Sequence, residues 1–353
     1  MDKNWFRQAA KPLDSQCHQR AFARQSQLTK PAGSLGLLET LACRLAALQA
    51  SDRPQVERVA IRLFAADHGI AEQGVSAFPQ EVTVQMIANF VQGGAAISVL
   101  AKDSGANLEI VDMGTCASPL AMSGVIDRSI AQGTRSFHEQ AAMSEEQLFL
   151  ALKAGAEQVT GADEQGCDLF IAGEMGIANT TSAAAIAACL LNSEISDMVG
   201  PGTGINEQGI EHKINIIERA VAHHRGVGVD LNDAMQVLQT FGGFEIAAMT
   251  GAYMRCAQLG IPILVDGFIS TAAFLCAERL LPGTRHWGIF SHMSAEPGHQ
   301  IMLQSLEAKP LLQLGMRLGE GSGAAVAIPL LKNACALHNQ MATFTEAAVS
   351  DAS

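Results

Sequence analysis

Basic residues are scarce in this sequence, and their scarcity narrows the range of partners. The 23 Lys and Arg residues are outnumbered by 35 Asp and Glu residues, which gives a formal net charge of -12 at pH 7. An acidic surface repels phosphate backbones and anionic lipids, so we expect neither nucleic acid nor a membrane as a partner. Charged residues make up only 16% and hydrophobic residues 48% of the 353 residues, which predicts a compact, well-buried globule of one large domain or two.

Long apolar runs, an export signal and paired cysteines are also missing. No apolar run comes close to the roughly 18–20 residues of a transmembrane span. The opening MDKNWFRQAAKPLD lacks the apolar core of a signal peptide. The 8 cysteines are scattered without a Cys-x-x-Cys pair, and we expect them to be reduced. These features predict a cytoplasmic protein that handles a small molecule.

Short β-rich runs alternate with helical segments along the middle of the chain. The predicted strands are Val59–Ala66, Leu108–Val111, Leu169–Ala172, Ile261–Val265 and His286–Phe290. The predicted helices are Glu81–Ala101, Glu145–Thr160, Thr181–Leu191, Glu207–His224 and Glu245–Leu259. This alternation, with nearly continuous apolar strands, is typical of a parallel α/β sheet covered by helices on both faces.

Polar side chains stand at or just beyond the ends of several predicted strands. They are Asp67, Glu174, Asp266 and Ser291. Parallel α/β sheets bind their ligands outside the carboxyl ends of the strands. The sequence therefore predicts a small-molecule site at this edge of the sheet.

The two ends of the chain carry helical patterns and no strand pattern. We predict helices over Leu35–Leu48 and Ala324–Met341, and a helical tail from Pro310 onward. These pieces predict a small helical domain formed by residues 1–55 with 310–353. The α/β domain would then span residues 56–309.

One carboxylate near the C-terminus stands between glycines. The stretch Leu318-Gly-Glu-Gly-Ser-Gly-Ala-Ala325 places Glu320 at or just before the start of a helix. Glycine on both sides permits backbone conformations closed to other residues and leaves room for a ligand beside the acid. Two interpretations stay open, namely an acidic helix cap that complements the helix dipole, or a general base in an apolar pocket.

Two loops that contain glycines precede helices and could hold an anion. Gly173–Ser182 follows a strand and opens a helix whose first turn offers N–H groups and hydroxyls, although Asn179 or Thr180 could simply cap that helix. Gly200–Gly204 precedes a helix that carries Lys213, which suits a phosphate cradle unless the lysine is solvated surface. The Walker pattern is absent, because no Gly-Lys-Ser/Thr occurs.

Several side chains could suggest a metal site, namely His68, His292, Glu296 and His299. Their spacing is not His-Glu-x-x-His, and Pro297-Gly298 interrupts any helix that would align them. We expect neither a metal nor a cofactor. We expect His292 and Glu296 to orient the loop at Ser291 by hydrogen bonding instead.

An NAD-binding oxidoreductase is the main alternative class of protein. Gly319-x-Gly321-x-x-Ala324 loosely matches a dinucleotide fingerprint, but it follows no clear strand, and no acid appears before Thr345 to hold a ribose. The first predicted strand is followed by a single glycine, Gly69, rather than by a glycine fingerprint. A non-catalytic nucleotide-binding module is a third possibility, and in that module Glu320 would be dispensable.

The segment Phe78-Pro-Gln-Glu-Val-Thr-Val-Gln-Met86 joins a loop to a helix. Phe78, Gln85 and Met86 could line an apolar slot for a flat ligand, and core packing is the alternative explanation.

These stretches, taken in order, resemble one family along nearly the whole chain. The matching segments are Lys30-Pro-Ala-Gly-Ser-Leu-Gly36, Ala66-Asp-His-Gly69, Pro79-Gln-Glu-Val-Thr83, Gly93-Gly-Ala-Ala-Ile97, Gly173–Thr181, Gly242-Gly-Phe-Glu-Ile246, Asp266-Gly-Phe-Ile-Ser270, Ser291–Glu296 and Met316–Ala325. The family is nicotinate-nucleotide–dimethylbenzimidazole phosphoribosyltransferase, of cobalamin nucleotide-loop assembly. Each segment alone is a weak signal, but their number and order are specific.

The resemblance implies a fold, a reaction and a set of roles. The fold would be a Rossmann-like parallel sheet plus a small helical domain from both termini, in a homodimer. The reaction would move the 5-phosphoribosyl group from nicotinate mononucleotide to 5,6-dimethylbenzimidazole. By resemblance, Glu320 is the catalytic base. The phosphoribosyl part would contact Glu174, Gly176, Asn179, Thr180, Gly202, Thr203, Gly204, Lys213 and Ser291, and the benzimidazole would contact Phe78, Gln85, Met86 and Leu318.

Overall fold

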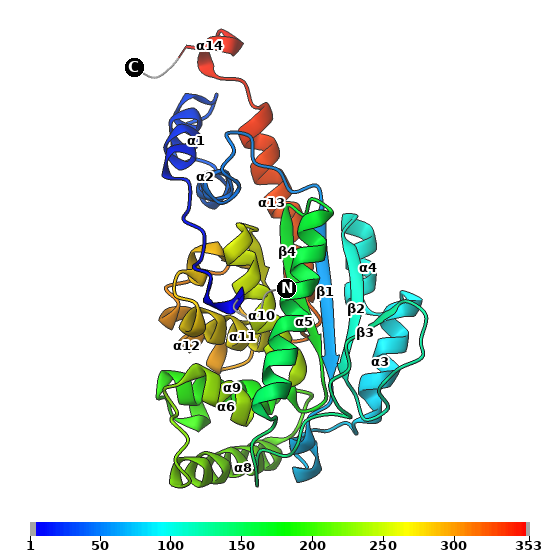
Figure 1. The fold of residues 1–353 in the computed structure, drawn as a ribbon. Coiled ribbons are helices and arrows are strands. Elements are labelled where there is room, and N and C mark those ends of the chain that lie inside the picture. The colour runs from blue at the N-terminus through cyan, green and yellow to red at the C-terminus, as the bar shows by residue number, and fades with distance from the viewer. Residues whose placement is uncertain (1–4, 351–353) are drawn as a thin grey trace.

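A parallel sheet organises residues 5–350, the part of the chain that this computed structural model describes. Its strand order is β3-β2-β1-β4-β5-β6, and every neighbouring pair is parallel. The strands are β1 (Val59–Ala66), β2 (Asn107–Gly114), β3 (Val125–Asp127), β4 (Leu169–Met175), β5 (Ile263–Val265) and β6 (Gly288–Phe290). Figure 1 shows β4, β1, β2 and β3 side by side. This is the Rossmann order, in which the winding direction reverses between β1 and β4.

All five predicted strand positions are confirmed, with small differences at their ends. β5 and β6 each begin two residues after the predicted start, and a short 3₁₀ helix, η3 (Thr284–Trp287), leads into β6. The sequence analysis missed β3, which has only three residues at the edge of the sheet and is partly exposed. A strand that short and that exposed carries no apolar run from which it could be recognised.

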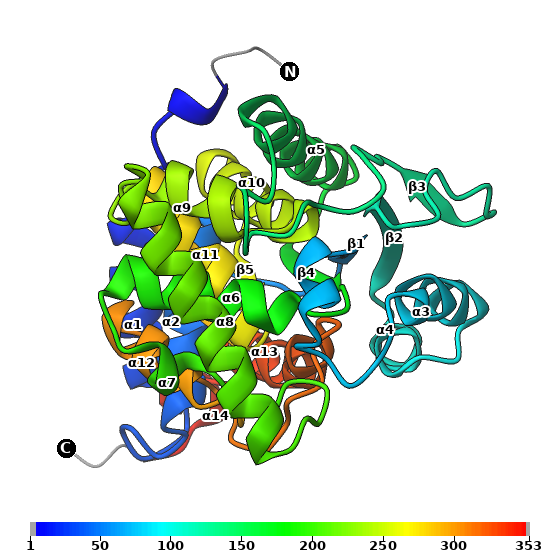
Figure 2. The ribbon, with the colours of Figure 1, turned by 90° about the horizontal axis from the view of Figure 1, so that it is seen from below.

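Helices cover both faces of the sheet (Figure 2). α10 packs on β1, β2 and β4, α11 packs on β4 and β5, and α5 lies against α10. On the other face, α3 and α4 pack on β2 and α13 packs on β4. The helices are α1 (Ser15–Gln27), α2 (Leu37–Gln49), α3 (Glu81–Gln92), α4 (Ala96–Ser104), α5 (Glu145–Glu164), α6 (Asn179–Leu191), α7 (Ile195–Met198), α8 (Glu207–Gly226), α9 (Ala234–Phe241), α10 (Phe244–Leu259), α11 (Phe268–Leu280), α12 (Gly298–Ser305), α13 (Ser322–Gln340) and α14 (Phe344–Ala347).

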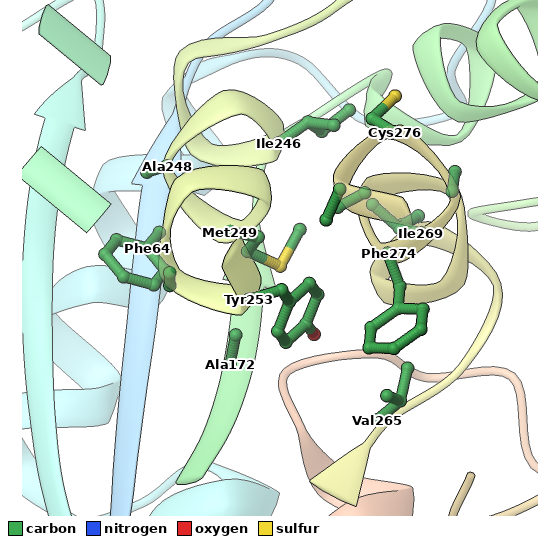
Figure 3. Packing of buried hydrophobic residues seen from close by; sticks show 14 of the residues in the cluster. Phe64, Ala172, Ile246, Ala248, Met249, Tyr253, Val265, Ile269, Phe274 and Cys276 are labelled. Carbon is green, nitrogen blue, oxygen red and sulfur yellow. The ribbon is translucent and has the colours of Figure 1, made fainter. Parts of the chain in front are cut away.

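The crossing of α5 and α10 depends on glycine. A Cβ atom on Gly155 would lie 1.8 Å from the carbonyl oxygen of Ala248, and one on Gly251 would lie 2.0 Å from that of Leu152. The two backbones therefore touch without intervening side chains. Beyond this crossing, the core fills with larger side chains from α10, α11 and the strands (Figure 3).

The segment Glu81–Ser104 departs from prediction in two ways. With a mean hydropathy of 1.4 over its most apolar window, it is long and apolar enough to cross a membrane by length and composition, which the sequence analysis did not expect. It is also not one helix, because the chain breaks at Gly93, whose φ is 82°, between α3 and α4. A helix of α3's length, at about 1.5 Å per residue, covers roughly 18 Å, well short of the roughly 30 Å of a bilayer core.

Helices from the two ends of the chain lie together. α1 packs on α2, and α13 packs on both of them (Figure 1). α13 also packs on α4 and β4, so its contacts reach into the sheet layer. The division into residues 1–55 with 310–353 and residues 56–309 stays a prediction, and residues 1–4 and 351–353 lie outside the described residues.

The prediction of helix from Pro310 onward is wrong for the first dozen residues. Residues 310–321 contain no helix and run beside the segment that follows β6. The carbonyl oxygens of Leu312 and Met316 accept hydrogen bonds from the N–H groups of Met293 (2.8 Å) and Ala295 (2.9 Å). This pairing carries the chain to the carboxyl edge of the sheet, where Glu320 lies.

Candidate active site

A cavity of about 470 Å³ opens at the carboxyl edge of the sheet, beyond β4 and β5. Its lining residues are Phe78, Val82, Met86, Glu174, Met175, Gly176, Ile177, Asn179, Thr180, Gly202, Thr203, Asp266, Gly267, Phe268, Ile269, Ser270, His292, Ser294, Glu296, Arg317, Leu318, Gly319 and Glu320. Two other cavities, of about 600 and 620 Å³, lie away from the strand ends, one beside α6 and α8 and one beside α1 and α2. The cavity at the strand ends is the one that gathers the predicted residues.

Most of the predicted site residues line this cavity. They are Phe78, Met86, Glu174, Gly176, Asn179, Thr180, Gly202, Thr203, Leu318 and Glu320. They come from the start of α3, the β4–α6 turn, the loop before α8 and the segment before α13, which are far apart in the sequence. Asp266, predicted only as a polar residue at a strand end, also lines the cavity.

Gln85 does not reach the cavity. It is exposed on α3, whereas Val82 and Met86 face the cavity. The assignment of Gln85 to the benzimidazole therefore stays a prediction.

Lys213, Ser291 and Gly204 also lie outside the cavity wall. Lys213 is buried behind it, and Gly204 is exposed beyond its edge. Ser291 is fully buried, and its hydroxyl lies 3.4 Å from the carbonyl oxygen of Asp266. The Glu296 carboxylate accepts a hydrogen bond from the Gly202 N–H (3.1 Å), which ties the segment after β6 to the loop before α8. The role of His292 and Glu296 in orienting the loop at Ser291 stays a prediction.

The sequence analysis did not single out Arg317 or Ser270, although both lie in segments quoted for the family resemblance. Arg317 could have been found from its position, because it stands three residues before the glycine-flanked Glu320 in a chain that has few basic residues. Ser270 carried no comparable signal, because a lone serine in a helical segment is ordinary.

Two buried carboxylates hold the backbone around Glu320. Glu320 has a left-handed φ of 64°, between glycines whose φ values are 87° and 82°. Its N–H donates to Oε1 of Glu174 (3.3 Å). The N–H groups of Gly321 and Ala324 donate to the two carboxylate oxygens of Asp266 (3.1 and 2.8 Å). A left-handed conformation at a residue with a side chain costs on the order of 1–3 kcal/mol, and it persists only where the surroundings hold it.

The Glu320 side chain is buried and incompletely paired. It is 6% exposed, and Oε2 has no hydrogen-bond partner among the described residues. Burial raises the pKa of Glu320, the Asp266 carboxylate adds to the rise, and the N–H of Ile97 opposes it. Burial likewise raises the pKa of Glu174 to about 8, against a hydrogen bond from Asn179. An unpartnered carboxyl with a raised pKa in a cavity is the arrangement of a general base.

A buried ammonium stands behind the opposite wall of the cavity. Lys213 is 1% exposed, and its Nζ donates to Oγ1 of Thr180 (2.8 Å) in the first turn of α6. Burial lowers the pKa of Lys213 to about 8, and Glu296 opposes the shift, so the ammonium stays largely charged at pH 7. Positive charge beneath a helix N-terminus suits an anion such as a phosphate.

Two of the buried histidines near the cavity have hydrogen-bond partners within the protein, whereas Nδ1 of the buried His292 has none among the described residues. His68 lies between Oε1 of Glu245 (2.6 Å) and the hydroxyl of Ser182 (2.9 Å), directly beneath the β4–α6 turn. His299 accepts a hydrogen bond from the Ser294 N–H (2.8 Å). Among residues 5–350, no three His, Cys, Asp or Glu side chains gather as metal ligands.

The strand order defines a Rossmann-like α/β protein, and the first turn of α6 offers N–H groups that suit an anion. A family model described as "Phosphoribosyltransferase" matches residues 10–349, so the class is a phosphoribosyltransferase. Two relatives carry the name nicotinate-nucleotide–dimethylbenzimidazole phosphoribosyltransferase over 351 aligned residues, 99% of this chain and of each relative. The Pseudomonas fluorescens protein is 56% identical and a Pseudomonas aeruginosa protein 54% identical.

A solved structure agrees with these relatives. The crystal structure of the Thermus thermophilus protein of that name superposes with a TM-score of 0.89 at 40% identity, and the match covers 96% of this chain and 99% of the other. The chain belongs to the nicotinate-nucleotide–dimethylbenzimidazole phosphoribosyltransferase family. The family resemblance and the Rossmann-like fold predicted from the sequence are confirmed, and the oxidoreductase alternative finds no support.

Proposed function

We propose that this enzyme transfers the 5-phosphoribosyl group of nicotinate mononucleotide to 5,6-dimethylbenzimidazole, giving α-ribazole 5′-phosphate and nicotinate in cobalamin biosynthesis. The observation that carries the proposal is the strained turn that presents the unpartnered carboxyl of Glu320 to the cavity. Relatives that share more than half of the residues of this chain are named for the same two substrates.

The leaving group determines which catalytic group the reaction needs. The nicotinate ring is bonded to ribose as a pyridinium and departs with a neutral ring nitrogen, so little acid assistance is required. The benzimidazole must lose its N–H proton as its other nitrogen attacks the anomeric carbon. Glu320 accepts that proton, a general-base contribution typically worth about 10²–10⁴-fold. A raised pKa makes the ionised carboxylate a stronger base.

The two substrates are assigned to opposite parts of the cavity. The phosphate is assigned to the first turn of α6, where the Lys213 ammonium lies behind Thr180. The benzimidazole is assigned to the cavity mouth, where Phe78 is 51% and Leu318 is 58% exposed and Met86 lies nearby. A planar aromatic base would cover these apolar side chains, which otherwise face water.

A single displacement fixes the stereochemistry. The benzimidazole and the departing nicotinate occupy opposite faces of the ribose, so the β-nucleotide gives an α-product. No diphosphate leaves in this reaction, so the proposal gives magnesium no step. The same reasoning assigns no cofactor.

The proposal extends to a cytoplasmic homodimer. All 8 cysteines are free, as a reducing compartment would keep them. Phe22 and Leu37 are 67% and 52% exposed. Phe22 lies on α1 and lines the cavity of about 620 Å³, and Leu37 at the start of α2 lines a neighbouring cavity of about 300 Å³. A second copy of the chain would cover these apolar side chains.

Incubation of the purified protein with nicotinate mononucleotide and dimethylbenzimidazole tests the proposal directly. We expect α-ribazole 5′-phosphate and nicotinate in equal amounts by chromatography, with the same rate after exhaustive chelation. Hydrolysis to ribose 5-phosphate, or no consumption of the base, would contradict the proposed reaction. A rate lost on chelation and restored by a metal would contradict the metal-free chemistry.

A further inference from the structure

The charged residues that line the main cavity are unbalanced. Glu174, Asp266, Glu296 and Glu320 contribute four carboxyl groups. Among the cavity-lining residues that the structure describes, Arg317 is the only lysine or arginine. None of these four groups, whether protonated or ionised, supplies a positive charge, so an anionic ligand that enters this cavity needs a cation from another residue.

Arg317 is anchored at one end and open at the other. Its Nη1 donates to the carbonyl oxygen of Gly202 (2.9 Å), which ties the segment before α13 to the loop before α8. Within residues 5–350, its remaining N–H groups make no hydrogen bond, and the side chain is exposed at the cavity. A guanidinium offers five donors in a planar fork, so one edge stays open for a ligand.

The nucleotide substrate of the proposed function carries two anionic groups. The phosphate is assigned to the first turn of α6 and to Lys213, which is buried behind Thr180 and does not itself line the cavity. The carboxylate on the pyridine ring has no cation among these groups. Arg317 is the only lysine or arginine among the described residues that line the cavity, so it is the cation left for that carboxylate.

We propose that Arg317 binds the pyridine carboxylate of the nucleotide and thereby selects nicotinate mononucleotide over nicotinamide mononucleotide. This inference rests on the proposed function. Guanidinium and carboxylate pair through two parallel hydrogen bonds, whereas the neutral amide of nicotinamide offers a single acceptor atom and a donor that faces the guanidinium unfavourably. Arg317 therefore acts as a specificity residue, and Glu320 remains the base.

The test compares three substrates that differ in whether they carry the phosphate, the pyridine carboxylate or both. Nicotinate mononucleotide carries both groups, nicotinamide mononucleotide only the phosphate, and nicotinate riboside only the carboxylate. Arg317→Met removes the guanidinium and keeps the length of the side chain. Arg317→Lys keeps a charge without the fork. Arg219→Met, at an exposed position on α8 outside the cavity, is the matched control and should behave like the wild type.

We expect Arg317→Met to lower kcat/KM for nicotinate mononucleotide and nicotinate riboside by roughly 10- to 100-fold and to leave nicotinamide mononucleotide nearly unchanged. Arg317→Lys should keep part of the preference. Equal loss for both mononucleotides with the riboside spared would make Arg317 a phosphate ligand. An equal loss of kcat/KM for all three substrates would mean that Arg317 only holds the Gly202 loop in place. Either result overturns the proposal.

Calorimetric binding of free nicotinate and free nicotinamide provides a readout that does not depend on turnover. The wild type should bind nicotinate more tightly, and Arg317→Met should remove that difference. If the wild type shows this difference but transfers no phosphoribosyl group, the proposed function fails while the carboxylate assignment stands. If turnover is normal and Arg317→Met keeps the full preference for nicotinate, the assignment to Arg317 is wrong.

Discussion

Two neighbouring carboxylates hold the backbone conformation of Glu320. Glu174 and Asp266 accept the backbone N–H groups on either side of it and so hold a left-handed turn that a glutamate alone would leave. A Cβ atom on Gly319 would lie 2.2 Å from Oε1 of Glu174, so only glycine fits there. Burial is the main cause that raises the pKa of Glu320, and the charge of Asp266, which also holds the turn, adds to the rise.

Glu320→Gln should fold normally and lose about 10²–10⁴-fold in turnover, because it keeps the shape and removes the base. Steady-state kinetics at neutral pH measures the loss. Glu307→Gln is the matched control, since Glu307 also has a positive φ (54°), but its side chain is 77% exposed. A Glu320→Gln enzyme that keeps more than about a tenth of the wild-type rate would contradict the assignment of Glu320 as the base.

Asp266→Asn should shift the pH dependence of the reaction. Protonation of Glu320 removes the base, so kcat/KM falls as the pH drops through the pKa of Glu320, which lies above the ordinary glutamate value. Removal of the Asp266 charge stabilises the Glu320 carboxylate and lowers its pKa. The acid limb of the pH profile should therefore move to lower pH, and an unmoved or higher limb would argue against this coupling.

Lys213→Met should weaken nicotinate mononucleotide much more than nicotinate riboside, because only the nucleotide carries the phosphate. The ammonium lies behind Thr180, so it acts on the phosphate through the first turn of α6. The ratio of kcat/KM for the two substrates should fall roughly tenfold or more. Equal losses for nucleotide and riboside would mean that Lys213 does not contribute to phosphate binding.

At the residue scale, glycine patterns were the informative part of the sequence. The two glycines beside Glu320 indicated its special backbone correctly, and the glycine loops indicated two walls of the cavity. The burial of Lys213 was not predictable, because it depends on α8 packing behind α6. The exposure of Gln85 was not predictable either, because it depends on how α3 packs against the rest of the chain.

At the scale of elements, the strands were predictable and the segments near the site less so. Val59–Ala66 is buried along its whole length, and such runs show clearly in a sequence. α11, which packs on β4 and β5, was missed, and residues 310–321 were taken for helix. Their structure depends on tertiary contacts such as the pairing of Met316 with Ala295, which no local pattern encodes.

The close approach of α5 and α10 yields a prediction about stability. Gly155→Ala places a Cβ 1.8 Å from the carbonyl oxygen of Ala248, so the helices must separate, at a cost of about 1–3 kcal/mol. Gly161→Ala on the same helix is the control, since nothing lies within 4 Å of its added Cβ, and it should be neutral or slightly stabilising. Urea denaturation measures both, and equal stabilities would show that the crossing tolerates side chains.

At the scale of the whole molecule, strand order explains where the site lies. All strands of the sheet are parallel, so their carboxyl ends share one edge, and the segments at the ends of β4 and β5 supply nearly half of the residues that line the cavity. The acidic net charge excluded nucleic acid as an expected partner, but it did not reveal that the cavity itself is lined with acids and one arginine. The strand alternation predicted the class of fold, and the relatives identify the family.

The configuration of the product at the anomeric carbon tests the central claim most directly. The wild-type enzyme is supplied with β-nicotinate mononucleotide and dimethylbenzimidazole, and the nucleotide formed is examined by NMR. A single displacement assisted by Glu320 predicts the α-anomer alone, formed in step with nicotinate release. A β-linked product, or nicotinate released without any new bond to the base, would contradict the account.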